Sequence, residues 1–173
     1  MEYKFRNLKA TEIDCRVSQI NEKGLSLLLY KDARVDMDIL DETVGPMNWQ
    51  RTHTRDNANC VIEIWDEDKK QWIGKEDTGT ESFSEKEKGL ASDSFKRAGF
   101  NWGIGRELYT APFIYVPIVD AKNEVNFILE DKQGKKTTKT KFYVEAIEIT
   151  NKEITGLAIK NNKGKRVFVY KKG

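Results

Sequence analysis

The sequence predicts an α+β fold, and three features of its pattern carry that prediction. Apolar residues recur at helical spacing in three segments, one strand alternates between core and mixed residues, and several short strands follow Pro112. The chain has 173 residues, of which 38% are hydrophobic and 10% aromatic, so it is long and apolar enough to form a real core.

The amino-terminal elements are predicted to be a helix, a strand and a second helix. Residues 8–20 are expected to form a short helix because their apolar residues fall on one side, and the strongly apolar residues 25–30 are expected to form a buried strand. Helical spacing returns over 31–44. This helix is expected to end at Gly45 and Pro46, since glycine and proline commonly follow the end of a helix.

Three strands and the longest helix are predicted next. The strands are expected over 49–55, 59–65 and 71–78, with a charged hairpin turn at 66–70. The middle strand places every second residue on a core face. Residues 84–109 are expected to form the longest helix.

This predicted helix has a packing stripe and two cations outside it. The stripe consists of Ala91, Phe95, Ala98, Trp102, Gly105 and Tyr109. Lys96 and Arg97 are adjacent and lie outside the stripe, so they can present fixed positive charge to a phosphate backbone. An exposed ion pair between Asp93 and Arg97 explains the arginine equally well, and such a pair contributes only about 0.2–0.5 kcal/mol.

Beyond Pro112 the pattern predicts a carboxy-terminal β element. Its strands are expected over 113–119, 125–129, 141–149, 153–159 and 166–170. The polar, lysine-rich segment 131–140 is expected to be a mobile loop or a boundary. We therefore expect a core over 1–112 and a β-rich extension over 113–173.

Composition limits the kinds of protein and site. No stretch approaches the roughly 20 apolar residues of a membrane span, and residues 1–10 lack the apolar core of a signal peptide, so we expect a cytoplasmic protein with no membrane partner. Cys15 and Cys60 fit no disulfide framework or zinc-ligand spacing, and His53 is the single histidine. Structural zinc and Cys-His catalysis are therefore not expected.

Positive charge is concentrated at the carboxy-terminal end. Residues 130–173 carry 12 Lys and Arg against 5 Asp and Glu, a net charge of +7, whereas residues 1–129 carry 18 against 23, a net charge of −5. Such a bias favours nucleic-acid binding, and solvated lysines on exposed hairpins explain it equally well. A polyanion bound by the larger part must lie in a local basic groove.

Catalytic motifs are weak in this chain. Gly103 and Gly105 lack the preceding strand and the third glycine of a dinucleotide site, and no P-loop lysine follows them, so they are expected to permit close helix packing. The carboxylates between Asp36 and Glu42 are the type that a metal-dependent nuclease uses, but their spacing spreads them around a helix. We expect no enzyme, no metal and no cofactor, with such a nuclease as the enzymatic alternative.

Binding is the class that the residues favour. Cations are interleaved with Trp49, Trp65 and Trp72, the mixture that single-strand binders use to neutralise phosphates and stack bases. The candidate cations are Lys31, Arg34, Arg51, Arg55, Lys69, Lys70, Lys75, Lys86, Lys88, Lys96 and Arg97. Tryptophans more often belong to a core, and Arg34 can simply pair with Asp38 one turn away.

Four segments, taken in order, resemble the Rad52 family of single-strand annealing proteins, including its phage-encoded members, over roughly residues 8–109. The segments are LKATEIDCR, LLLYKDARVDMDILDETVGPMNW, the hairpin VIEIWDEDKKQWIGKEDTG and SDSFKRAGFNWGIGRELY. The last is similar to the family's Asp-x-x-Lys-Arg-Ala helix followed by an aromatic residue and glycines.

The resemblance implies a β-β-β-α core, to which the sequence pattern adds a carboxy-terminal β-hairpin element. It also implies a ring or helical homo-oligomer with single-stranded DNA in a positive groove. Lys96 and Arg97 stand at the positions of the family's Lys-Arg pair in the inner DNA site, and Arg34 matches a further basic position of that groove. The hairpin supplies further candidates by placement, Lys69, Lys70 and Lys75, and family members also carry lysines at the positions of Lys86 and Lys88.

The function implied by the resemblance is ATP-independent binding of single-stranded DNA and annealing of complementary strands, in homologous recombination or DNA repair in a bacterial or phage-infected cell. The alternative is a monomeric protector of single strands, or a scaffold for replication or recombination proteins that recruits its partner through the basic tail.

Overall fold

A computed structural model of the chain describes residues 2–80 and 86–173 and divides the chain into two compact units. Unit 1 comprises the amino-terminal residues up to Asn7 together with Asp32–Arg106, and unit 2 comprises Leu8–Lys31 and Glu107–Gly173. The described residues contain two α-helices and many antiparallel strands, so the predicted α+β class is confirmed.

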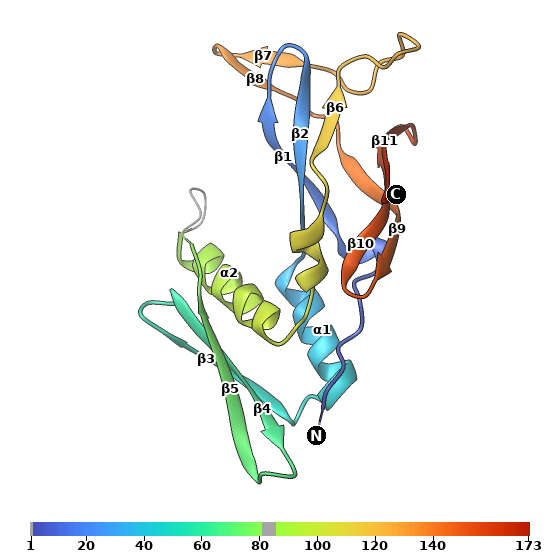
Figure 1. Cartoon of the computed structure of the whole chain (residues 1–173). Helices are drawn as coiled ribbons and strands as arrows, with labels where there is room; N and C mark the ends of the chain where they lie inside the picture. Colours follow the sequence, from blue (N-terminus) through green and yellow to red (C-terminus); the bar gives the residue numbers. More distant parts are fainter. Residues whose placement is uncertain (1, 81–85) are drawn as a thin grey trace. The chain divides into compact units, whose positions relative to one another are not determined.

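Unit 1 is built on a three-stranded antiparallel sheet with the order β3-β4-β5, and α2 lies across one face of it (Figure 1). The strands are β3 (Trp49–Thr54), β4 (Asn59–Asp66) and β5 (Gln71–Thr78), and the helices are α1 (Ala33–Val44) and α2 (Lys86–Asn101). Cys60, Ile62 and Ile64 of β4 are almost fully buried, which confirms the core face that alternation predicted for the middle strand.

The two ends of α1 follow from the residues that flank it. The Asp32 carboxylate accepts a hydrogen bond of 2.8 Å from the backbone N–H of Arg34, as an N-cap residue does. The helix stops at Gly45, whose φ of +86° suits glycine and whose N–H donates to the Asp41 carbonyl at 3.0 Å. The predicted end of this helix is therefore confirmed.

The longest helix ends eight residues earlier than predicted, at Asn101. Gly103 adopts a φ of +92°, and the N–H of Ile104 donates to the carbonyl of Gly99 at 3.0 Å while the N–H of Gly103 donates to that of Phe100 at 2.9 Å. This is a Schellman motif, which reverses the chain at a helix end. The expectation that Gly103 permits close helix packing is therefore wrong, because it terminates the helix instead.

The packing stripe is correct only as far as the helix extends. Phe95 and Ala98 are fully buried, as predicted, and Trp102 donates its indole N–H to the Ile62 carbonyl at 3.0 Å. Tyr109 lies beyond the helix, in the 3-10 turn η2 (Arg106–Thr110), and is 67% exposed. Gly105 also has a positive φ, of +69°, so it does not continue the stripe.

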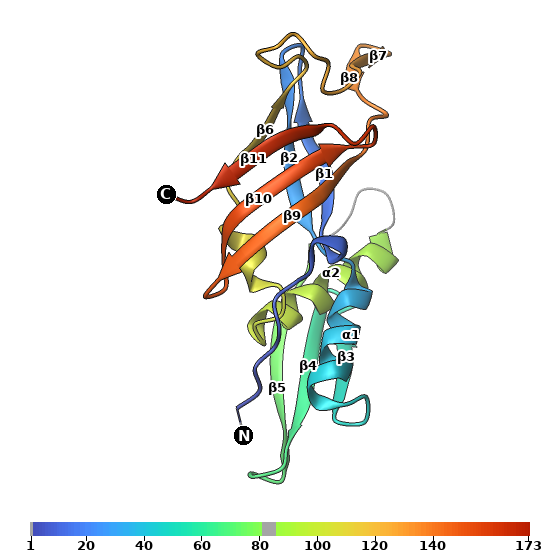
Figure 2. The ribbon, with the colours of Figure 1, turned by 90° about the vertical axis from the view of Figure 1, so that its right-hand side faces the viewer.

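Unit 2 is a six-stranded antiparallel sheet with the order β11-β10-β9-β1-β2-β6, whose strands Figure 2 shows from one side. The strands are β1 (Asp14–Ile20), β2 (Gly24–Tyr30), β6 (Ile114–Pro117), β9 (Phe142–Thr150), β10 (Glu153–Asn161) and β11 (Arg166–Lys171). The strands predicted around 25–30, 113–119, 141–149, 153–159 and 166–170 are confirmed.

Two predictions for this unit are wrong. The helix expected over 8–20 is only a 3-10 turn, η1 (Ala10–Glu12), followed by β1. The strand expected over 125–129 is reduced to an isolated bridge between Val119 and Val125. The segment 131–140, expected to be a mobile loop or a boundary, contains most of a small hairpin of β7 (Glu130–Lys132) and β8 (Lys135–Thr137).

The division expected at residue 112 is also wrong. Strand β1 pairs with β2 and, at one register position, with β9, and β2 pairs with β6. The amino-terminal strands therefore belong to the same sheet as the carboxy-terminal ones, because their hydrogen-bonding partners lie after residue 113.

Candidate nucleic-acid interface

Arg34 and Lys96, which come from different helices of unit 1, both act on the carboxylate of Asp32. Arg34 donates from Nε to Asp32 Oδ1 at 3.0 Å and from a terminal nitrogen to Oδ2 at 3.3 Å. The Arg34 side-chain hydrogen bonds, followed by its backbone N–H, lower the pKa of Asp32, and the positive charge of Lys96 adds to the effect. The Arg34 side chain is 83% exposed, and it pairs with Asp32 rather than with the predicted Asp38.

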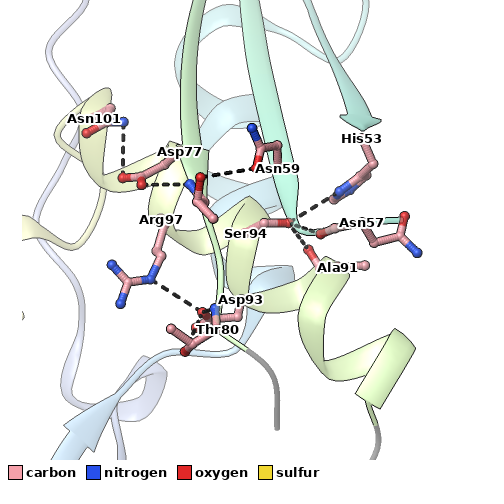
Figure 3. A network of polar contacts seen from close by, with 11 residues as sticks. His53, Asn57, Asn59, Asp77, Thr80, Ala91, Asp93, Ser94, Arg97 and Asn101 are labelled. Atoms are coloured by element: carbon pink, nitrogen blue, oxygen red, sulfur yellow. Dashed lines mark hydrogen bonds and ion pairs between the residues drawn. The ribbon is translucent and has the colours of Figure 1, made fainter. Parts of the chain in front are cut away.

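Arg97 forms the ion pair that the sequence offered as an alternative. Its Nε lies 3.4 Å from Asp93 Oδ2, and the same oxygen accepts the backbone N–H of Thr80 at 2.8 Å. The side chains of Arg97 and Asp93 are 38% and 32% exposed. Figure 3 shows the two terminal guanidinium nitrogens turned away from Asp93, so the ion pair does not engage them.

A serine and a histidine meet on another side of α2. Ser94 Oγ donates to the Asn57 carbonyl at 2.9 Å and lies 3.3 Å from His53 Nδ1 (Figure 3). Ser94 is fully buried. Burial, assisted by the positive charge of Arg51, lowers the pKa of His53. The hydrogen bond to Asn57 holds α2 against the turn between β3 and β4. Because Ser94 is buried, its hydroxyl is closed to a substrate.

Arg51 of β3 covers a core residue. Its guanidinium lies 4.6 Å from the centre of the Phe95 ring, and the Trp49 ring stacks on the same phenylalanine with centroids 6.1 Å apart. The Trp49 indole N–H donates to Asp41 Oδ1 at 2.6 Å. Both side chains thus contribute to packing, which agrees with the core interpretation of Trp49.

Lys75 is engaged at the carboxy-terminal end of α2. Its Nζ donates to the Asn101 carbonyl at 3.0 Å and lies 4.7 Å from the centre of the Trp102 ring. Arg106 donates to the carbonyls of Phe100 and Asn101 at 2.8 and 3.1 Å. These cations satisfy carbonyls that a helix end leaves without partners. Arg106 was not among the predicted site residues, although a basic residue just after a helix is a known signal for this role.

Three further candidate cations of unit 1, Lys69, Lys70 and Arg55, lie in turns. Lys69 approaches Asp66 at 3.7 Å, and Lys70 pairs with Glu67, within the turn that joins β4 and β5. Arg55 is exposed in the turn between β3 and β4 and has a φ of +53°. These side chains are accessible to a polyanion, but they do not adjoin the Arg34 and Lys96 pair through any contact within the described residues.

The last three candidate cations are Lys86, Lys88 and Lys31. Lys86 and Lys88 lie in the first turn of α2, and their side chains lie outside the described residues. Lys31, the last residue of the first segment of unit 2, is only 1% exposed. This burial does not favour a contact between its ammonium group and phosphate, which stays a prediction.

The other two tryptophans pack against each other. Trp65 and Trp72 stand edge to face with centroids 5.6 Å apart, and the Trp65 indole N–H donates to Glu67 at 2.7 Å. Trp72 is 37% exposed. Their mutual packing stabilises the hairpin of β4 and β5.

The acidic residues of α1 are held by separate partners. Asp41 accepts the Trp49 indole N–H, and the Glu42 carboxylate accepts two hydrogen bonds from Arg6, at 2.6 and 3.2 Å. Asp36 is fully buried. Among the described residues no group of three or more His, Cys, Asp or Glu side chains is placed to hold a metal ion.

Comparisons of the chain with protein-family models, with curated proteins and with solved structures found no match. In the described ranges, no helix is both long and apolar enough to cross a membrane. Function is therefore inferred from the arrangement of the residues themselves.

Proposed function

We propose that the protein binds single-stranded DNA and anneals complementary strands without ATP, in homologous recombination or DNA repair. The observation that carries the proposal is the Asp32 carboxylate, which Arg34 of α1 binds directly and to which Lys96 of α2 contributes positive charge, while Arg97, the next residue of α2, has its terminal guanidinium nitrogens turned away from Asp93. The three residues that the Rad52 resemblance assigns to one groove thus come from two helices of the same unit. The element order β3, β4, β5, α2 also agrees with the β-β-β-α core that the resemblance implies.

The carboxylates near these cations do not prevent DNA binding. The Arg97–Asp93 pair joins two partly exposed side chains, and such i,i+4 pairs contribute only about 0.3–0.5 kcal/mol. A phosphate accepts two hydrogen bonds from one guanidinium, which makes a stronger contact than a single one at 3.4 Å. A DNA strand therefore displaces Asp93 from Arg97 at little cost.

Annealing follows from the same chemistry. Two complementary strands repel each other through their phosphates, and cations that neutralise one strand lower this repulsion. Contacts to the sugar-phosphate chain leave the choice of sequence to base pairing. A homo-oligomer, ring or helical, extends the groove over many nucleotides, and this assembly is part of the proposal.

The test compares Lys96→Ala/Arg97→Ala with a control that removes two exposed lysines of unit 2, Lys122→Ala/Lys171→Ala. Fluorescence anisotropy with a labelled dT oligonucleotide at several salt concentrations measures affinity and its salt slope. Loss of two phosphate contacts reduces the slope by about 1.4, at about 0.7 per contact with a single strand. The control is expected to keep the wild-type slope.

Annealing of complementary oligonucleotides, measured without nucleotide, completes the test. The wild type is expected to accelerate annealing, and the Lys96 and Arg97 variant to lose most of the acceleration. Unchanged affinity of that variant at low salt, or annealing no faster than without protein, would overturn the proposal. Tight binding by a monomer in light scattering, without annealing, would instead favour a single-strand protector or scaffold.

A further inference from the structure

The register of the sheet in unit 2 places two tyrosines and two cations in one row. Tyr30 pairs with Asp14, Asp14 with Tyr143, Tyr143 with Lys160, and Lys160 with Arg166. Directly paired residues of neighbouring strands point to the same face of a sheet. Tyr30 and Tyr143 are 40% and 48% exposed, so this face presents two partly open rings to solvent, one on each side of Asp14.

A groove of about 720 Å³ opens beside these tyrosines. It lies between β1 and the segment that leads into β9, because the two strands pair only at Asp14 and Tyr143 and then diverge. We call it the tyrosine groove and define it by the lining residues Asp14, Arg16, Tyr30, Lys139, Lys141 and Tyr143.

The cations of the tyrosine groove are available to a ligand. The Arg16 guanidinium lies 5.9 Å from the centre of the Tyr30 ring. Within the part of the chain that the structure describes, neither Arg16 nor Lys141 forms an ion pair. Lys139 is 78% exposed and only approaches Glu130, at 3.7 Å. The groove therefore combines positive charge with exposed aromatic faces.

This combination fits a single-stranded nucleic acid. Aromatic side chains on an open sheet face are a recurrent platform for unstacked bases, and neighbouring cations neutralise the phosphates. Asp14 lies between the two rings, where a base edge would lie, and a carboxylate there can accept a hydrogen bond from an amino group of cytosine. An acidic peptide could bind the cations, but its carboxylates would be repelled by Asp14.

The groove does not carry a reactive thiol. Cys15 also lines it, and burial, together with the negative charge of Asp14, raises the pKa of this cysteine to about 12. The thiol stays protonated at neutral pH, so binding and not covalent chemistry is the role that the groove supports.

We propose that the tyrosine groove is a further binding site for single-stranded nucleic acid, in which bases stack on Tyr30 and Tyr143 while Arg16 and Lys141 contact phosphates. This inference deepens the proposed function, because the ligand is the same kind of strand. It rests on residues of unit 2, whereas Arg34, Lys96 and Arg97 belong to unit 1. Variants can therefore separate the two sites.

The first experiment measures oligonucleotide binding by Arg16→Ala/Lys141→Ala and by Tyr143→Ala, with Lys122→Ala/Lys171→Ala as the charge-matched control. The double variant is expected to reduce the salt slope by about 1.4 relative to the control. The tyrosine variant is expected to lose about ten-fold in affinity, within the range of one stacked base. Asp14→Asn is expected to reduce any preference for dC over dT oligonucleotides.

A second measurement needs no variant and therefore does not depend on folding of the mutants. Wild-type protein is photocrosslinked to an oligonucleotide that carries 5-iododeoxyuridine, and the linked peptides are identified by mass spectrometry. Peptides that contain Tyr30 or Tyr143 are expected. Crosslinks confined to unit 1, or a double variant that binds like its control, would overturn the inference.

The outcomes distinguish this inference from the proposed function. If Lys96→Ala/Arg97→Ala weakens binding and the groove variants do not, only the groove inference fails. If neither set weakens binding, the proposed function fails as well. If a fluorescent oligoglutamate peptide binds and depends on Arg16 and Lys141 while the oligonucleotide does not, the groove is a site for an acidic protein partner and the inference is wrong.

Discussion

If Arg97 contacts phosphate as proposed, neutralising Asp93 is expected to strengthen binding of single-stranded DNA, because Asp93 would compete with phosphate for Arg97. Asp93→Asn removes the charge opposite Arg97. It retains a side-chain oxygen that can accept the Thr80 N–H, which lies 2.8 Å from Asp93 Oδ2 in the wild-type structure. The pair is a partly exposed one at 3.4 Å between residues one helical turn apart, which is worth about 0.2–0.5 kcal/mol. Removing this competition corresponds to an affinity gain of up to about two-fold.

A double-mutant cycle measures whether the gain acts through Arg97. Wild type, Asp93→Asn, Arg97→Ala and the combined variant are titrated with the same dT oligonucleotide at one salt concentration. Asp93→Asn is expected to increase affinity only where Arg97 is present. Weaker binding by Asp93→Asn, or an equal gain in the Arg97→Ala background, would refute direct contact between Arg97 and the strand.

Three further predictions concern stability. Arg51→Ala is expected to lower the free energy of unfolding by about 1 kcal/mol, since it removes the cation over the Phe95 ring, and thermal melting should show a Tm lower by about 2–4 °C while Arg55→Ala has no effect. Gly103→Ala is expected to cost about 1–2 kcal/mol from its φ of +92° alone, because an added Cβ would meet no atom within 4 Å; a Tm equal to wild type would contradict the Schellman assignment. The native state lowers the pKa of His53, so the unfolded state binds more protons than the native state below about pH 6.5. Denaturant titrations should therefore show the free energy of unfolding decreasing as the pH is lowered below 6.5, and decreasing less steeply in His53→Gln.

Elements whose neighbours in space are also neighbours in the sequence were predictable. The strands β3, β4 and β5 form successive hairpins, so alternation within each strand was enough to place Cys60, Ile62 and Ile64 in the core. The end of α1 was equally local, because Gly45 carries the required positive φ. In both cases the residues that decide the structure lie within a few positions of one another.

Elements whose secondary structure depends on hydrogen-bonding partners far away in the sequence were not predictable. Ile13, Val17 and Ile20 fit the spacing of a helix, yet the segment forms β1 because it pairs with β2 on one side and meets β9 at Tyr143. That second partner lies near the other end of the chain, so no local pattern reveals it. The same long-range pairing explains why the division at residue 112 failed.

The roles of individual cations show the same limit. The spacing of four residues was enough to predict the Asp93–Arg97 pair. By contrast, Arg51 and Lys75 stood among the candidate DNA contacts on sequence alone, and the structure engages them with Phe95 and with the end of α2. A positive charge is visible in the sequence, but the group that it satisfies is fixed by tertiary packing.

The ion pair of Arg97 and its proposed contact with DNA are not mutually exclusive. In the sequence they stood as rival explanations, because an arginine held by a carboxylate has no need of a phosphate. The structure shows that the two roles are compatible, because the contact is a single long one between partly exposed groups and the two terminal guanidinium nitrogens are turned away from Asp93. On the proposed function, a pair this weak yields to a bidentate phosphate when a strand arrives. Asp93 would then set how tightly the strand is held, which is the reason why its neutralisation tests the proposed interface more sharply than removal of the arginine alone.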